Sequence, residues 1–60
     1  MITERDAYVE MDQVRAQEIS LLDAARKIYQ WATFADEALL KGDVDLARAC
    51  IAVVVEMTKR

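Results

Sequence analysis

A single glycine, Gly42, is the only strong helix breaker in this chain of 60 residues, which contains no proline. Because Gly and Pro are the residues that most often end a helix, long helical segments are expected on both sides of Gly42. Before Gly42, apolar or small residues recur at alternating spacings of three and four, with one interruption at Glu18. This spacing predicts one face of a helix. Its members are Ala7, Met11, Val14, Leu21, Ala25, Ile28, Ala32, Ala35 and Leu39.

Two capping signals leave open whether residues 3–40 form one helix or two. Thr3 precedes Asp6, and Ser20 precedes Asp23, at the spacing of a helix N-terminal capping box. The second signal follows a polar stretch that ends at Glu18. The sequence therefore allows either a continuous helix or a break near residues 19–20.

The segment Lys41-Gly42-Asp43 predicts a tight turn. Gly supplies a left-handed backbone after a helix end, Lys41 complements the helix dipole, and Asp43 can cap the next helix. A final helix is expected over residues 44–59. Its β-branched residues would suit a strand, but an isolated strand would have no partner. We predict one all-α domain over residues 1–60, a helical hairpin preceded by an N-terminal amphipathic helix.

The size and hydrophobicity of the chain favour self-association. A domain of this length buries only about 60% of its unfolded surface, yet 55% of the residues are hydrophobic. The last helix is apolar around most of its circumference, so it needs cover from the N-terminal helix, a second copy, or both. We predict a dimeric helical bundle. Its predicted self-association residues are Leu21, Ala25, Ile28, Ala32, Ala35, Leu39, Leu46, Cys50, Ile51, Val53, Val54 and Met57.

The sequence has no convincing catalytic or metal-binding pattern. It contains no His, and its one Cys, Cys50, has apolar neighbours, so we interpret it as a small buried hydrophobe. The acids Asp36, Glu37, Asp43 and Asp45 surround the turn but lack the spacing of a calcium loop. We expect them to cap helices or face solvent. The prediction is no enzyme activity, cofactor, metal or small-molecule substrate.

Charge argues against a nucleic-acid partner. The formal net charge is −3, and acidic residues are concentrated in the first part of the chain. Such a surface repels nucleic acid and anionic lipid. A DNA-binding dimer would need its cations on one face: Arg5, Arg15, Arg26, Lys27 and Arg48.

Nothing in the sequence predicts a membrane segment. The longest apolar run, residues 49–55, is far shorter than the roughly 18 residues or more that a membrane span requires. The first residues lack the basic start and apolar stretch of a signal peptide. With a single Cys, which suits a reducing compartment, a cytoplasmic location is the expectation.

The preferred hypothesis is a small non-enzymatic protein–protein interaction module, an adaptor, inhibitor or regulator that acts as a homo-oligomer. The alternatives are a dimeric nucleic-acid-binding transcriptional regulator and a small structural subunit of a larger assembly. Aromatic residues at interface edges and acidic residues of the first helix supply the candidates for binding another protein. These are Tyr8, Glu10, Asp12, Tyr29, Trp31 and Phe34.

Overall fold

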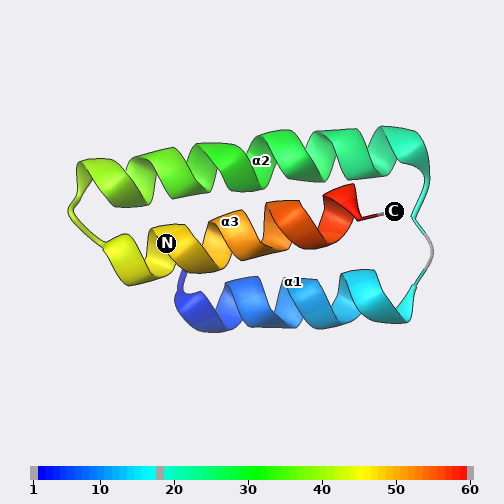
Figure 1. Cartoon of the computed structure of the whole chain (residues 1–60), viewed down its shortest axis with the longest axis horizontal. Helices are drawn as coiled ribbons and strands as arrows, with labels where there is room; N and C mark the ends of the chain where they lie inside the picture. The colour runs from blue at the N-terminus through cyan, green and yellow to red at the C-terminus, as the bar shows by residue number, and fades with distance from the viewer. Residues whose placement is uncertain (1, 18, 60) are drawn as a thin grey trace.

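The computed structural model describes residues 2–17 and 19–59, and its regular structure is entirely helical. The helices are α1 (Glu4–Ala16), α2 (Leu21–Leu40) and α3 (Val44–Thr58). α3 packs against both other helices, parallel to α1 and antiparallel to α2 (Figure 1). The all-α prediction is confirmed for the described residues. None of the helices in this part of the chain has both the length and the apolar character that a membrane span requires.

Capping side chains define the starts of α1 and α2, so residues 3–40 form two helices. The Asp6 N–H donates to Thr3 Oγ1 (3.4 Å), and the Thr3 N–H donates to the Asp6 carboxylate (2.8 Å), which completes a capping box. The Asp23 N–H donates to Ser20 Oγ (3.1 Å) at the start of α2. α1 ends where Gln17 adopts an extended backbone. Glu18, where the apolar spacing is interrupted, lies outside the described residues.

The turn between α2 and α3 is closed by backbone hydrogen bonds. The Gly42 N–H donates to the Leu39 carbonyl oxygen (3.0 Å), and the Asp43 N–H donates to the Ala38 carbonyl oxygen (2.8 Å). This pair of bonds is the Schellman arrangement, which requires a left-handed residue. Gly42 supplies it with φ +80°. The Asp43 carboxylate then accepts from the Leu46 N–H (3.1 Å), so the chain reverses direction within a few residues.

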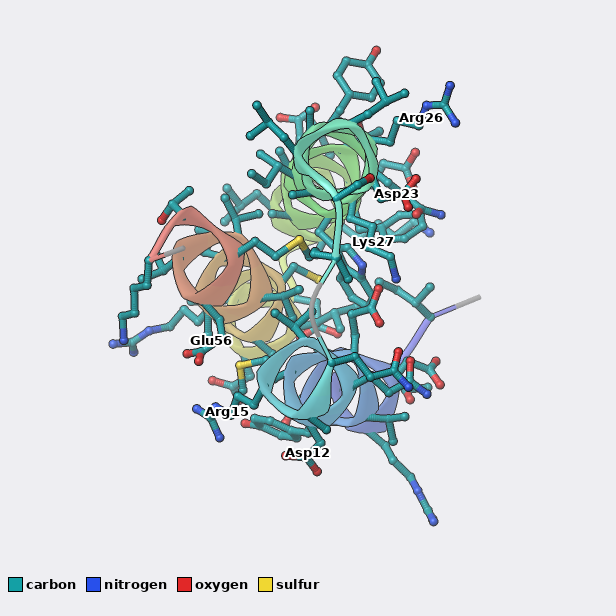
Figure 2. The ribbon with its side chains drawn as sticks, turned by 90° about the vertical axis from the view of Figure 1, so that its right-hand side faces the viewer. Asp12, Arg15, Asp23, Arg26, Lys27 and Glu56 are labelled. Atoms are coloured by element: carbon teal, nitrogen blue, oxygen red, sulfur yellow. The ribbon has the colours of Figure 1, made fainter. Side chains whose placement is uncertain are left out.

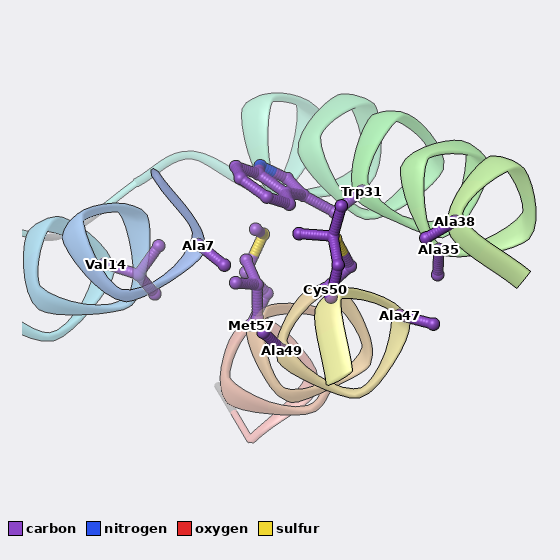
Figure 3. Close-up of a cluster of buried hydrophobic side chains, with 11 residues drawn as sticks. Ala7, Val14, Trp31, Ala35, Ala38, Ala47, Ala49, Cys50 and Met57 are labelled. Carbon is purple, nitrogen blue, oxygen red and sulfur yellow. The ribbon is translucent and has the colours of Figure 1, made fainter. Parts of the chain in front are cut away.

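The core between the three helices consists mainly of small side chains. Figure 3 shows the indole ring of Trp31 reaching from α2 toward Ala7 of α1, above Met57 of α3. Trp31 is the largest side chain in this core, and its ring meets that of Phe34 edge-on with centroids 5.2 Å apart. The buried residues in the described part of the chain are Ala7, Val14, Ala24, Trp31, Ala35, Ala38, Leu46, Ala47, Ala49, Cys50, Val53 and Met57.

Replacing Gly42 with Ala should lower the free energy of unfolding by about 1–2 kcal/mol, because an L-residue with a Cβ is strained in the left-handed region. An added Cβ would meet no atom within 4 Å, so the cost is conformational rather than steric crowding by neighbours. Urea unfolding followed by circular dichroism, at one fixed protein concentration, measures this change in the free energy of unfolding. Gly42→Asn is the matched control and should cost less, because Asn tolerates this conformation better. Equal stability of Gly42→Ala and the parent chain would contradict the assignment.

Candidate protein interface

The leucines of this protein lie mostly outside its core. Four of its five leucines are exposed, whereas six alanines are buried among the described residues. Folded chains usually bury Leu more completely than this, and an exposed cluster of large apolar side chains commonly marks a binding surface. The exposed large apolar residues in the described part of the chain are Tyr8, Val9, Leu21, Leu22, Tyr29, Leu39, Leu40, Val44, Ile51 and Val55.

The structure divides the predicted self-association residues into three groups. Buried within the chain are Ala35, Leu46, Cys50, Val53 and Met57. Partly buried against the core are Ile28 and Val54. Exposed are Leu21, Ala25, Ala32, Leu39 and Ile51. The buried group is enclosed by the chain's own three helices. α1 therefore already covers part of the apolar surface of α3 that the sequence predicted to need a partner. The exposed group lies mainly on α2.

Half of the exposed large apolar residues named above lie on one side of α2, here called the α2 outer face. It comprises Leu21, Leu22, Ala25, Tyr29, Ala32, Leu39 and Leu40. Leu21 is 88% exposed and Leu40 is 81% exposed, close to the exposure of an unfolded chain. Leu22 and Leu40 were missed by the sequence prediction, which followed a single stripe. The signal was present in the doublets at residues 21–22 and 39–40, because adjacent helical residues point about 100° apart and cannot share one narrow stripe.

A second surface is a groove between α1 and α3. Its apolar lining consists of Met11, Ile51, Ala52 and Val55, and its charged lining consists of Arg15, Arg48, Glu56 and Lys59.

The charged lining of this α1–α3 groove is held together by ion pairs. Arg15 Nε donates to Glu56 Oε1 at 3.1 Å, and Lys59 Nζ lies 3.8 Å from Glu56 Oε2. The bond to Glu56 raises the pKa of the Arg15 guanidinium. In Figure 2, which looks along the helices, Arg15 and Glu56 lie at the lower left of the bundle and Arg26 of α2 lies at its upper right. The groove lining comes from α1, α3 and Lys59. The groove and the α2 outer face are therefore separate surfaces.

The candidates for binding another protein are also separated by the fold. Trp31 is buried, and Glu10 and Phe34 are partly buried, so these three belong to the packing between helices. Tyr8, Asp12 and Tyr29 are exposed. The sequence pattern did not distinguish them because aromatic residues serve both cores and interfaces.

Glu10 links α1 to α2 through one carboxylate oxygen. Lys27 Nζ donates to Glu10 Oε1 at 2.7 Å, and Trp31 Nε1–H donates to the same oxygen at 3.3 Å. The Glu10 side chain is only 12% exposed. A buried indole N–H needs an acceptor, and a charged acceptor makes the stronger bond. Glu10 therefore fixes both the Trp31 ring and the position of α1 against α2.

Cys50 and Asp43 have structural roles. Cys50 is completely buried in the core. Burial, with a smaller contribution from the Asp43 carboxylate, raises the pKa of the Cys50 thiol and disfavours the reactive thiolate. Asp43 caps α3. The described residues bring no three His, Cys, Asp or Glu side chains close enough together to hold a metal ion.

The five cations that the nucleic-acid alternative needs on one face come from all three helices: Arg5 and Arg15 from α1, Arg26 and Lys27 from α2, and Arg48 from α3. Lys27 turns toward α1 to pair with Glu10, Arg15 pairs with Glu56 of α3, and Arg26 points outward from α2 (Figure 2). Arg15 and Lys27 therefore already pair with carboxylates of the same chain.

Comparison of the chain with protein-family models, with curated proteins and with solved structures finds no match.

Glu10→Ala should lower the free energy of unfolding by about 1–3 kcal/mol, because it leaves the Trp31 N–H without its acceptor. In a Trp31→Phe background the same substitution should cost clearly less, since Phe has no N–H to satisfy. Urea unfolding of the four chains, at one concentration, gives the coupling between the two sites. An equal cost of Glu10→Ala in both backgrounds would show that the bond to Trp31 contributes nothing to stability.

Proposed function

We propose that this protein is a small non-enzymatic interaction module that acts as a homo-oligomer and presents a further surface to another protein. The observation that carries the proposal is the exposure of four of its five leucines, all on α2. Alanine thus occupies half of the buried positions in the described part of the chain, while the leucines of α2 are exposed. Such a distribution suits a surface that is covered in the working state.

The energetics support this view. Burying a leucine stabilises a protein by roughly 1.5–3 kcal/mol, and a symmetric dimer buries each leucine twice, once from each copy. Association costs about 4–15 kcal/mol in lost translational and rotational freedom. The four exposed leucines on each chain, with Tyr29 between them, supply a stabilisation of the same order as this cost. The burial of a single leucine from each copy would not offset this cost.

The α1–α3 groove supplies the further surface. It lies away from α2, so it remains accessible when the α2 outer face is covered. Tyr8 and Asp12 of α1 are exposed as well. The function we propose therefore uses α2 for self-association and leaves α1 and α3 for an adaptor, inhibitor or regulator role.

Light scattering after size exclusion, over a range of concentrations, should give a mass at or above that of a dimer. Leu22→Glu combined with Leu40→Glu should shift the mass to that of a monomer, because burying unpaired carboxylates opposes association. Val9→Glu is the matched control, since it adds the same charge at an exposed apolar position of α1 and should leave the mass unchanged. A parent chain that stays monomeric at every concentration would contradict the proposal.

A further inference from the structure

The α2 outer face has the spacing of a coiled-coil seam. Residues 22, 25, 29, 32, 36 and 39 follow one another at steps of three, four, three, four and three. This alternation keeps them on one stripe of a helix that packs along another helix. All six positions are exposed, and five of them carry apolar side chains. The sixth is Asp36.

The spacing of this stripe is the same when it is counted in the reverse direction. Counted backward from Leu39, the steps are again three, four, three, four and three. An antiparallel second copy of α2 therefore presents matching layers to the first. In this register Leu22 of one copy meets Leu39 of the other, and Tyr29 meets Ala32. The outer leucines follow the same rule, with Leu21 against Leu40.

The charges on this face distinguish antiparallel from parallel packing. In the antiparallel register Asp36 of one copy lies opposite Ala25 of the other, and Arg26 is the next residue. Each Asp36 can then pair with Arg26 of the second copy, twice in the dimer. A parallel arrangement would instead place the two Asp36 carboxylates opposite each other, which is unfavourable. Neither residue makes an ion pair with any other described residue of its own chain.

We propose that α2 packs antiparallel against α2 of a second copy, about a twofold axis at the level of residues 30 and 31. This inference rests on the proposed self-association and specifies its surface, direction and register. The leucine pairs at residues 21–22 and 39–40 pack against each other at the two ends of the seam. Tyr29 lies over the small Ala32 of the other copy near the axis, where a larger residue would hold the helices apart. The reciprocal Arg26–Asp36 pairs select the second copy in this orientation.

Disulfide cross-linking tests the direction of the helices. In a Cys50→Ala background, Leu22→Cys and Leu39→Cys are made as separate chains. Residues 22 and 39 are separated by about 25 Å along a helix, at 1.5 Å per residue. Antiparallel packing predicts that neither chain cross-links with itself under mild oxidation, and that a mixture of the two does. Both leucines are exposed, so the fold of the single chain does not depend on them.

Charge exchange tests the register. Arg26→Asp and Asp36→Arg should each weaken the dimer by about tenfold or more in Kd, because each places like charges opposite one another. The chain carrying both substitutions should recover dimerisation, since the reciprocal pairs are restored with reversed sign. Arg5→Asp on α1 is the matched control and should leave the Kd unchanged.

The outcomes separate this inference from the proposed function. Cross-linking only in the mixture, with recovery in the doubly exchanged chain, supports the antiparallel seam. Self-cross-linking of Leu22→Cys alone overturns it in favour of parallel packing. An oligomer in which the mixture of the two cysteine chains forms no cross-link, or in which the doubly exchanged chain does not recover dimerisation, overturns the antiparallel seam while self-association stands. A parent chain that is monomeric throughout overturns both.

Discussion

The packing of α3 against both other helices around small side chains governs the rest of this structure. Ala7 of α1, Ala35 and Ala38 of α2, and Ala47 and Ala49 of α3 occupy positions where larger residues would separate the helices. Trp31 is the largest side chain of this core, and Phe34 and Ile28 of α2 pack partly buried against it. The four leucines of α2 lie on its exposed side. The buried core and the exposed α2 outer face are therefore two consequences of one packing arrangement.

Trp31 also determines which face of α2 is inside. Its ring fills the space between α1 and α2, and its N–H is satisfied by Glu10, which holds Lys27 as well. A rotation of α2 that buried Leu21, Ala25, Ala32 and Leu39 instead would expose the indole ring and break both bonds to Glu10. Such a rotation would exchange a buried aromatic residue and its polar partner for leucines at the helix ends. The leucines are thus left available to another molecule.

Much of this architecture could be predicted from the sequence. The caps at Thr3, Ser20 and Asp43 and the turn at Gly42 act locally, and each lies where its residue type is favoured. The choice of buried face on α2 could not be predicted in this way. The sequence pattern continued the α1 stripe to Leu21 and Ala25. Because the helix is interrupted before Leu21, however, α1 and α2 can rotate independently about their own axes, and the stripe need not stay on one face. The bond between Glu10 and Trp31 joins residues far apart in the sequence, and only the fold reveals it.

In the proposed dimer, the position of Asp36 determines the direction in which the two α2 helices pack. A fully apolar stripe would favour association but would specify neither orientation nor register, because leucines pack acceptably in several arrangements. A carboxylate within the stripe lowers the stability of any packing that leaves it unpaired. Since Arg26 and Asp36 lie at nearly equal distances from the middle of α2, an antiparallel copy satisfies both charges at once. In the antiparallel dimer that we propose, the polar residue that weakens general hydrophobic association is therefore also the one that makes the surface selective for a second copy of the chain.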